Sequence, residues 1–528
     1  MSNHAYESAA ALRPSSNGPI PISTLCERFS LAPASAEDAA ALNDLSILGV
    51  SVDSADTAPG ELFVGLPGFT VHGARFAAEA VASGAVAVLT DSDGAQIVHQ
   101  AAPGTPVLVH SDPRAVVGPL SAEVYHHPAR GLVTTAVTGT NGKTTTAYFL
   151  DAILSAHVGG CMVAGTVELR VGERSVESPR TTVEAPVLQR MMALAVEDRV
   201  GAASLEASSH AIVLHRLDGI VVDVAGFTNL QRDHLDFHKT MEGYLEAKAQ
   251  LFTPEHARRG VVCVDDRWGA ALADEAPIEI DRVRAYPGET PADWWVSDAA
   301  VSLTDSATTF TLHGPDGEKI EASCPLPGLV NVQNAALALV MAIRAGVPAA
   351  TAAAALAGAH NIPGRMQRIS QRNGRRGLCI VDFAHTPEAM ELALKAVRPI
   401  TPGRLIVVFG SDGDRDQGKR PMLGEVCARL ADVLVVTDEN PRSEDPQLIR
   451  NAILEGVRGV RPDLTDVEEI TTWRGDAVRR GVELCGPDDT VIVTGKGHEP
   501  FLEMAGEFIR YNDAPVMAEA VEKKWGRA

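Results

Sequence analysis

A short glycine-rich loop between a predicted strand and a predicted helix constrains the fold of this chain most. The β-branched run Leu132–Thr138 predicts a buried strand, and the apolar period of Thr144–Ala156 predicts a helix. Between them, Gly139 and Gly142 let main-chain N–H groups close around phosphate oxygens where a Cβ would clash. The start of the helix adds its positive dipole end. The sequence therefore predicts an α/β fold with a phosphate site at this loop.

The loop itself is shorter than the common GxxxxGK[ST] motif, because Val137 stands where that motif has its first glycine. Lys143 is predicted to reach the β- and γ-phosphates of ATP, and the Thr144 hydroxyl to ligate Mg²⁺. The simpler interpretation is a glycine-rich turn without a ligand. The flanking strand and helix favour phosphate binding, because they are the context that a phosphate loop requires.

Length and charge limit the class of protein. The 528 residues exceed one hydrophobic core, and at roughly 150 residues per domain about three domains are expected. The net charge is −22, from 68 acidic and 46 basic residues. Such a surface should repel nucleic acid and anionic membranes, so we expect neither as a partner. Small anionic substrates remain possible, because local basic groups hold them.

The cysteines and the N-terminal segment indicate a compartment. The seven cysteines lie far apart, and none forms a CxxC pair or a Cys/His cluster at zinc spacing. Scattered thiols fit a reducing environment. The first residues lack the apolar core of a signal peptide, and no stretch approaches the ~20 apolar residues of a membrane span. We therefore expect a cytoplasmic protein.

Composition and turn residues divide the chain. Residues 1–20, rich in Ser, Asn and Pro, predict a flexible lead. An α/β segment follows at 21–130, and then the unit with the phosphate loop at 131–362. Alternating strands and helices at 363–528 predict a doubly wound, mostly parallel sheet. The predicted strands of the first and last segments are Glu61–Leu66, Val86–Thr90, Thr105–His110, Leu378–Phe383, Arg404–Phe409, Val433–Thr437 and Thr490–Thr494.

Four segments of the chain carry distinctive motifs: Thr138–Thr145 (TGTNGKTT), Glu206–His210 (EASSH), Asn229–Asp236 (NLQRDHLD) and Tyr244–Lys248 (YLEAK). In this order they resemble the ATP loop, the EVSSH motif, the NLxRDHLD motif and the YxxAK segment of the Mur ligases, which build the peptide stem of bacterial peptidoglycan. The resemblance covers roughly residues 45–515. It implies a three-domain architecture with a small N-terminal α/β uridine-binding domain, a central P-loop ATPase-like domain and a C-terminal Rossmann-like domain.

The resemblance also assigns nucleotide and metal residues. It implies ATP binding by Gly139, Thr140, Asn141, Gly142, Lys143, Thr144, Thr145, Asn331, Asn334 and Arg365. It implies Mg²⁺ ligation by Thr144, Glu206, His234 and Lys248, the last as carbamylated lysine, and catalytic roles for Lys143, Lys248 and His234. Taken alone, Glu206 and His234 would read equally well as surface or capping residues. Lys248, on a helix that we expect to face solvent, would read as a solvated charge.

A further set resembles the family's site for the acceptor, UDP-N-acetylmuramoyl-L-alanyl-D-glutamate. It comprises Val52, Ser54, Phe69, Thr70, Val71, Thr181, Thr182, Ser208 and Arg216. Three positions depart from the family's pattern: Ala55 replaces the Arg usual after Asp-Ser, Val183 replaces the Pro often found after the Thr181–Thr182 pair, and Leu214 stands where a relative carries Gln. One polar contact to the acceptor is therefore expected to be absent.

The last set resembles the site for the incoming amino acid. The segments Gly413–Asp416 (GDRD), Glu439–Arg442 (ENPR) and Gly495–Glu499 (GKGHE) resemble the family's GDRD, DNPR and GKGHE, and DNPR is associated with meso-diaminopimelate. The implied binding residues are Arg415, Glu439, Asn440, Pro441, Arg442, Gly495 and Glu499, with Glu439 in place of the usual Asp. Guanidinium groups suit the distal carboxylate of diaminopimelate, and Glu499 suits its ammonium. L-Lysine lacks that carboxylate and is expected to leave Arg442 unpaired.

The reaction that the resemblance implies consumes ATP, with Mg²⁺, to turn the D-glutamate γ-carboxylate into an acyl phosphate, which the amine of meso-diaminopimelate attacks. We expect a monomer whose domains close during turnover. Three alternatives remain: the same ligase using L-lysine or another diamino acid, another Mur or folylpolyglutamate-type ligase, and a P-loop ATPase switch without ligase activity. In the switch, Arg415, Arg442 and Glu499 would be ordinary surface charges.

Overall fold

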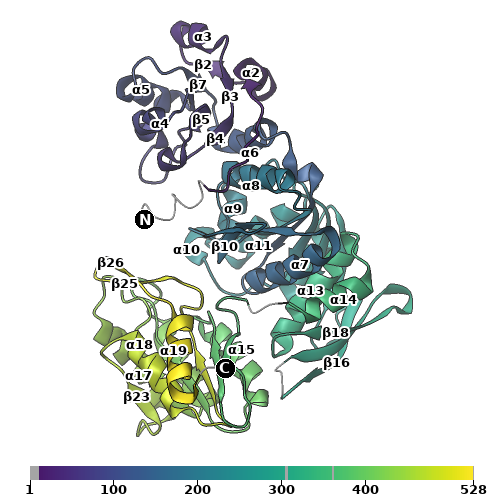
Figure 1. The fold of residues 1–528 in the computed structure, drawn as a ribbon, viewed down its shortest axis with the longest axis vertical. Coiled ribbons are helices and arrows are strands. Elements are labelled where there is room, and N and C mark those ends of the chain that lie inside the picture. Colours follow the sequence, from purple (N-terminus) through teal and green to yellow (C-terminus); the bar gives the residue numbers. More distant parts are fainter. Residues whose placement is uncertain (1–10, 304–306, 360–361, 527–528) are drawn as a thin grey trace. The chain divides into compact units, whose positions relative to one another are not determined.

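The structure is a computed structural model that describes residues 11–303, 307–359 and 362–526. It contains two compact units, whose helices and strands are labelled in Figure 1. The first consists of the described residues of Met1–Trp295, Gly314–Asp316 and Ala336–Ala355, and the second of those of Val296–His313, Gly317–Ala335 and Leu356–Ala528. Within the described ranges, no helix has both the length and the apolar character that a membrane span requires.

The N-terminal part of the first unit is a five-stranded sheet in the order β2-β7-β6-β5-β4. Its strands are β2 (Ala32–Pro33), β4 (Gly49–Ser51), β5 (Glu61–Val64), β6 (Ala87–Thr90) and β7 (Val107–Val109), and all except β2 run parallel. Every residue of β5 and β6 is buried. The three strands predicted in this segment are therefore confirmed, each with shorter bounds. The helices α4 (Ala77–Ala82), α5 (Ser92–Ala101) and α6 (Pro113–Val124) alternate with these strands.

Residues 11–20 are packed against this unit, which corrects the prediction of a flexible lead over residues 1–20. Leu12 is fully buried in the apolar cluster of the central sheet, which contains the strand before the glycine-rich loop. Arg13 donates to the Glu61 carboxylate and to the main-chain oxygen of Asp56. Composition misses these contacts because they come from two residues of a polar segment, whereas residues 1–10 lie outside the described residues.

The central sheet places β8 (Val133–Thr138) between β12 (Ala202–Glu206) and β13 (Val222–Phe227), parallel to both. Within the first unit the strand order is β11-β10-β9-β12-β8-β13-β14-β15. The remaining strands are β9 (Cys161–Ala164), β10 (Glu168–Val171), β11 (Arg174–Glu177), β14 (Ala257–Cys263) and β15 (Glu279–Arg284). A strand covered on both faces has a continuous apolar or β-branched sequence, and β8 is buried from its second residue onward.

Helix α7 (Lys143–Val158) begins directly after the glycine-rich loop. Gly142 precedes it with φ 92° and Gly159 ends it with φ 82°, and this left-handed region is open to glycine because it has no Cβ. Phe149, Leu150, Ile153 and Leu154 form its buried face. The predicted helix over Thr144–Ala156 is confirmed.

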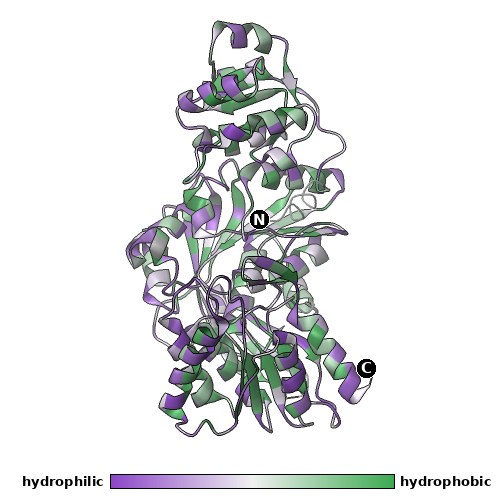
Figure 2. Ribbon diagram, turned by 90° about the vertical axis from the view of Figure 1, so that its left-hand side faces the viewer, coloured by the Kyte–Doolittle hydropathy of each residue, from purple (hydrophilic) through white to green (hydrophobic). Residues whose placement is uncertain are grey.

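The second unit contains a six-stranded sheet in the order β19-β20-β24-β21-β22-β23, parallel except for β19. The strands are β19 (Gln367–Ser370), β20 (Leu378–Val381), β21 (Leu405–Phe409), β22 (Val433–Val436), β23 (Val467–Glu469) and β24 (Thr490–Val493). The helices around it are α15 (Pro387–Val397), α16 (Lys419–Leu430), α17 (Pro446–Val460), α18 (Arg474–Leu484) and α19 (Asp513–Trp525). Figure 2 shows apolar strands enclosed by helices with hydrophilic outer faces, so the predicted doubly wound sheet is confirmed.

The sequence missed one hairpin of this unit, formed by β25 (Phe501–Met504) and β26 (Glu507–Arg510). Each strand has only four residues, and glutamates interrupt the apolar pattern. The unit also contains the hairpin β17 (Thr308–His313) and β18 (Lys319–Cys324), together with the first residues of α13 (Leu329–Arg344).

Candidate active site

The glycine-rich loop is held between the ends of β8 and β13. Thr140 N–H donates to the main-chain oxygen of Asn229 at 2.9 Å, and Asn141 N–H donates to its side-chain oxygen at 3.0 Å. A Cβ at Gly139, whose φ is 145°, would lie 1.8 Å from Thr228 Oγ1. Lys143 Nζ donates to the main-chain oxygens of Gly139 and Thr140 at 2.9 and 3.0 Å. The loop thus has the close turn and the folded-back lysine of a phosphate cradle.

Glu206 ends β12 beside this loop, and its side chain is buried. Its carboxylate accepts from Thr144 Oγ1 at 3.0 Å, and from the N–H and Oγ1 of Thr166 at 2.8 and 3.0 Å. The space is tight, because a Cβ at Gly165 would lie 2.3 Å from Glu206 Oε1. The structure therefore places two predicted magnesium ligands, Thr144 and Glu206, side by side. Hydroxyl and carboxylate oxygens are ligands that Mg²⁺ prefers, so this pair fits the ion.

Lys248 is buried on α11 (Met241–Ala249), which corrects the expectation of a solvent-facing position. Its Nζ donates to the main-chain oxygen of Gly139 at 3.0 Å and lies 4.4 Å from the centroid of the Tyr244 ring. Burial, with the charge of Lys143, holds the pKa of Lys248 well below its ordinary value. The amine is thus adjacent to the phosphate loop and has lost much of its preference for the charged form.

His234 lies in a cluster of rings next to Lys248. Its ring centroid is 4.9 Å from that of His210 and 6.1 Å from that of Tyr244. Burial, together with the charges of His210, Lys143 and Lys248, lowers its pKa, although Asp233 acts in the opposite direction. A neutral imidazole is the form that ligates metal.

The unmodified side chains do not form a complete set of metal ligands. Among the described residues, no group of three or more His, Cys, Asp or Glu side chains is arranged to hold a metal ion. The predicted ligand set contains a threonine and a modified lysine, which such a group does not include. The fit to Mg²⁺ therefore depends on the Thr144–Glu206 pair.

The predicted acceptor residues adjoin this pair. Thr182 Oγ1 donates to the main-chain oxygen of Glu206 at 2.6 Å and accepts from Ser208 N–H at 3.0 Å. Thr166 Oγ1, which also contacts Glu206, lies 3.2 Å from Thr181 Oγ1. Ser208 caps α9 (Ser209–Val213) by accepting from Ala211 N–H at 3.3 Å. The predicted acceptor residues Thr181, Thr182 and Ser208 thus share one hydrogen-bond network with the predicted metal residues Thr144 and Glu206.

Three arginines converge beside this network on one carboxylate. Arg114, Arg180 and Arg216 approach Glu184 to 3.4, 3.1 and 3.0 Å, and Arg216 also donates to the main-chain oxygen of Thr182 at 3.1 Å. Burial, followed by the charges of the other two arginines, lowers the pKa of Arg216 despite the opposing effect of Glu184. Sequence reasoning found Arg216 only: Arg114 lies in a segment without a motif, and Arg180 directly precedes the assigned pair Thr181 and Thr182.

The predicted uridine residues follow two adjacent parallel strands. The turn Ser54–Asp56 comes after β4, and the segment with Phe69 comes after β5. The carboxyl ends of parallel strands share one edge, so both segments belong to the same edge of the N-terminal sheet. Ser54 is buried, whereas the Phe69 side chain is 88% exposed. Val52, Thr70 and Val71 lie in the same two segments.

The remaining nucleotide residues belong to the second unit. Asn331 and Asn334 are buried on α13, and Asn331 Nδ2 donates to the Pro327 oxygen at 2.8 Å. The Arg365 guanidinium lies 4.4 Å from the centroid of the Phe383 ring. A cation over an aromatic face is a surface on which a nucleotide base can stack.

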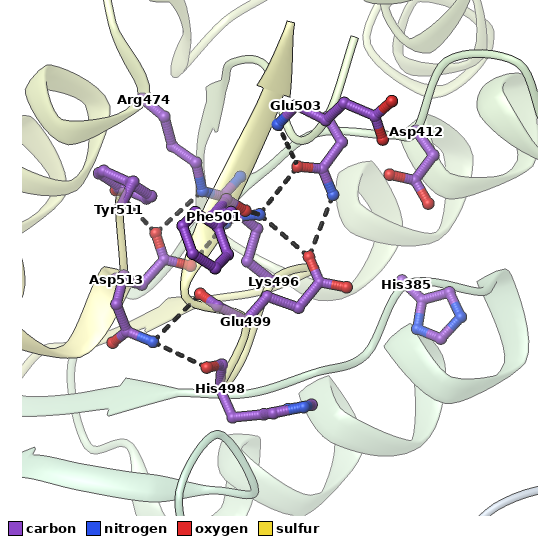
Figure 3. Close-up of polar contacts among 12 residues, drawn as sticks. His385, Asp412, Arg474, Lys496, His498, Glu499, Phe501, Glu503, Tyr511 and Asp513 are labelled. Carbon is purple, nitrogen blue, oxygen red and sulfur yellow. Dashed lines mark hydrogen bonds and ion pairs between the residues drawn. The ribbon is translucent and has the colours of Figure 1, made fainter. Parts of the chain in front are cut away.

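Two of the predicted amino-acid residues, Asn440 and Glu499, form a network around Lys496 (Figure 3). The buried Lys496 Nζ donates to Asn440 Oδ1 at 2.9 Å, to Glu499 Oε2 at 3.0 Å and to the Phe501 oxygen at 2.6 Å. Asn440 Nδ2 donates to Glu499 Oε2 at 3.0 Å. One oxygen of Glu499 is therefore fixed by two donors. Lys496 was not predicted as a site residue, although it lies inside the GKGHE segment.

Glu439 and Arg442 flank this network. Glu439 is buried, and burial, with the negative charge of Asp412, raises its pKa to about 8. A Cβ at Gly495 would lie 2.5 Å from Glu439 Oε2, so this position requires glycine. Arg442 Nη2 lies 3.9 Å from Asp412 Oδ2, and Nε lies 3.5 Å from Glu503 Oε2. The expectation that Arg442 lacks a partner without a distal carboxylate is therefore wrong. Arg415 is exposed, and Pro441 lies in the ENPR segment between Asn440 and Arg442.

Comparison with known families accounts for all three segments. Residues 46–125 match the model of the Mur ligase family catalytic domain, residues 137–342 that of the Mur ligase middle domain, and residues 364–497 that of the Mur ligase glutamate ligase domain. Along the chain, these three matches correspond to the N-terminal sheet, to the central sheet and to the six-stranded sheet of the second unit.

Individual relatives match over nearly the whole chain. A UDP-N-acetylmuramoyl-L-alanyl-D-glutamate–2,6-diaminopimelate ligase from Streptomyces coelicolor is 43% identical over 480 residues, 91% of this chain and 93% of the relative. A UDP-N-acetylmuramyl-tripeptide synthetase from Leifsonia xyli subsp. xyli is 42% identical, and the match covers 95% of this chain and 96% of the relative. The solved structure of a UDP-N-acetylmuramoyl-L-alanyl-D-glutamate–2,6-diaminopimelate ligase is similar with a TM-score of 0.63 and 31% identity, over 90% of this chain and 95% of that one. The chain belongs to the Mur ligase family of ATP-dependent acid–amino-acid ligases.

Proposed function

We propose that this chain adds meso-diaminopimelate to the D-glutamate γ-carboxylate of UDP-N-acetylmuramoyl-L-alanyl-D-glutamate in peptidoglycan precursor synthesis. The position of Glu206 carries the proposal. Its carboxylate accepts from Thr144 of the phosphate loop, and its main-chain oxygen accepts from the predicted acceptor residue Thr182. One residue thus joins the nucleotide and acceptor residues, as phosphoryl transfer to a carboxylate requires. The names of the relatives support the choice of substrates.

The reaction proceeds in two steps. The γ-carboxylate oxygen attacks the γ-phosphorus of ATP, so that an acyl phosphate forms and ADP leaves. The donor amine then attacks the acyl carbon, loses a proton, and phosphate leaves as the amide forms. Lys143 offsets negative charge as carboxylate meets phosphate. Mg²⁺, which we assign to Thr144, Glu206, His234 and modified Lys248, supplies further charge compensation when bound.

We propose that Lys248 carries the carbamate. Only an uncharged amine adds to carbon dioxide, and the lowered pKa of Lys248 supports that form. The product would be an anion beside the Gly139 oxygen and the loop, where an additional oxygen ligand suits Mg²⁺. The addition forms an N–C bond and releases one proton.

We assign the donor to the second unit. Arg415 and Arg442 supply guanidinium groups for its distal carboxylate, and Glu499 supplies a carboxylate for its distal ammonium. Glu439, Asn440, Pro441 and Gly495 complete the proposed site. Asn331, Asn334 and Arg365 are assigned to the nucleotide.

We also propose domain boundaries near residues 130 and 362 and a cytoplasmic location. The family matches end and begin on either side of both boundaries. The seven cysteines are all free thiols, which suits a reducing compartment.

The test is ADP release by the purified chain with Mg²⁺. Release should require both the UDP-linked acceptor and meso-diaminopimelate, and the product should gain the mass of one diaminopimelate residue. ADP release that ignores both substrates would favour the ATPase switch instead.

A further inference from the structure

The guanidinium of Arg442 has two carboxylate neighbours inside the second unit. These are Asp412 at 3.9 Å and Glu503 at 3.5 Å, with side chains 16% and 31% exposed beside 23% for Arg442. Charges sheltered to this degree interact more strongly than they do in water. The positive charge of Arg442 is therefore compensated by the protein itself.

Main-chain bonds hold Glu503 in this place. Arg442 N–H donates to the Glu503 oxygen at 3.0 Å, and Ala505 N–H donates to the Arg442 oxygen at 2.7 Å. Glu503 N–H donates in turn to Asn440 Oδ1 at 3.2 Å. None of these bonds uses the Glu503 carboxylate, so its side chain is free to act as a counter-charge. Figure 3 shows the carboxylates of Glu503 and Asp412 at the same end of the site.

Some buried polar atoms near Arg442 have no hydrogen-bond partner among the described residues. Glu439 is 2% exposed, and its Oε2 has no hydrogen-bond partner among the described residues. Asp412 Oδ1 is likewise buried without a hydrogen bond in the described part of the chain, whereas the buried Arg442 Nε has its ion pair with Glu503. Buried polar atoms are normally satisfied, so Glu439 Oε2 and Asp412 Oδ1 indicate the place of a polar ligand. Glu439 Oε2 can accept a hydrogen bond from the distal ammonium that all diamino acids share.

A donor without a distal carboxylate therefore meets no unpaired charge. L-Lysine would leave Arg442 with Asp412 and Glu503, so the penalty of a stranded buried cation does not arise. meso-Diaminopimelate would bring a second carboxylate that must compete with these two for Arg442. Internal compensation thus reduces the advantage of the larger donor.

We infer that Asp412 and Glu503 set the donor selectivity of this ligase: by compensating Arg442 they let the site accept a diamino acid that lacks the distal carboxylate alongside meso-diaminopimelate. The inference rests on the proposed function, because it concerns the donor of that reaction. It assigns a role to two residues that lie outside the ENPR, GDRD and GKGHE segments.

The experiment compares kcat/KM for meso-diaminopimelate and L-lysine in the wild type, Glu503→Gln, Asp412→Asn and the double variant. The wild-type ratio should lie far below the ~10⁴-fold of sites that reject an analogue by an unpaired buried group. The double variant should raise the ratio about tenfold, mainly by loss of activity with L-lysine, which is about 1.4 kcal/mol. Glu503→Gln alone should raise it in the same direction and keeps every main-chain bond.

The control is Glu507→Gln, which removes the same charge from an exposed position of the same hairpin. It should leave the ratio unchanged. An unchanged ratio in Glu503→Gln and in the double variant, with thermal unfolding like that of the wild type, would overturn the inference. A wild type that releases no ADP with either donor would instead overturn the proposed function, so the two failures are distinct.

Discussion

Different kinds of groups stabilise the phosphate loop of the first unit and the proposed donor site of the second unit. At the loop, main-chain atoms dominate: Thr140 and Asn141 donate their N–H groups to Asn229, and Lys143 folds onto two loop oxygens. At the donor site, side chains dominate, and Lys496 alone ties together Asn440, Glu499 and the Phe501 oxygen.

This difference determines what a substitution can change. The shape of the loop depends on Gly139 and Gly142, whose φ values of 145° and 92° are rarely adopted by other residues. A site shaped by charges from several segments depends on each of them, and Asp412 or Glu503 can alter its preference without altering the fold. Selectivity is therefore more easily changed at the donor site than at the loop.

The largest effect is expected at the loop. Lys143→Ala removes the lysine whose Nζ donates to the Gly139 and Thr140 oxygens of the loop. ADP release that depends on both substrates should fall by ~10³ or more, the scale of losing one charge-stabilising group. Lys395→Ala, which removes an exposed lysine of α15, is the control. Undiminished turnover in Lys143→Ala would contradict the role of the loop.

The next effect concerns stability at the donor site. The pKa of Glu439 is raised from 4.5 to about 8, so its contribution to stability is complete below about pH 4.5 and is lost as the pH rises toward 8. Glu439→Gln stays neutral and should gain about 3 kcal/mol over the wild type between pH 5 and pH 8. Urea unfolding at both pH values measures it, with the exposed Glu455→Gln as control. The same difference between variant and wild type at both pH values would exclude a buried, neutral Glu439.

Lys248→Ala tests the proposed carbamate in the first unit. Loss of a proposed metal ligand should lower activity ~10²-fold. A short carboxylic acid such as acetate should restore part of it, because it can supply the missing carboxylate in the vacated space. Acetate should not raise the activity of the wild type. No recovery over a range of acetate concentrations would count against a carbamate.

The smallest effect is expected from Lys496→Met, which removes three hydrogen bonds from the donor network. The KM for the donor should rise about tenfold, as loss of a charged hydrogen bond to Glu499 predicts. The KM for ATP should stay the same, and the exposed Lys523→Met should change neither. An equal rise in both KM values would indicate general damage to the fold.

Local sequence was sufficient for some features and insufficient for others. The strand β8, its loop and α7 were predicted because each depends on residues adjacent in the chain. The solvent-facing expectation for Lys248 was wrong because α11 shows no strong apolar face, and burial there comes from the loop and Tyr244. The packing of Leu12 and Arg13 was missed for a related reason, since the Arg13 partners lie 43 and 48 residues away.

The sequence by itself determined the family, the order of its domains and the residue types at the phosphate loop, because these follow from short motifs and local periodicity. Only the tertiary structure decided which charges meet. It brought Glu206 to Thr144 through neighbouring parallel strands, buried Lys248 against Gly139, and set Asp412 and Glu503 beside Arg442. The physical reason is that electrostatic interactions depend on distance and burial in space, and neither can be read from separation along the chain.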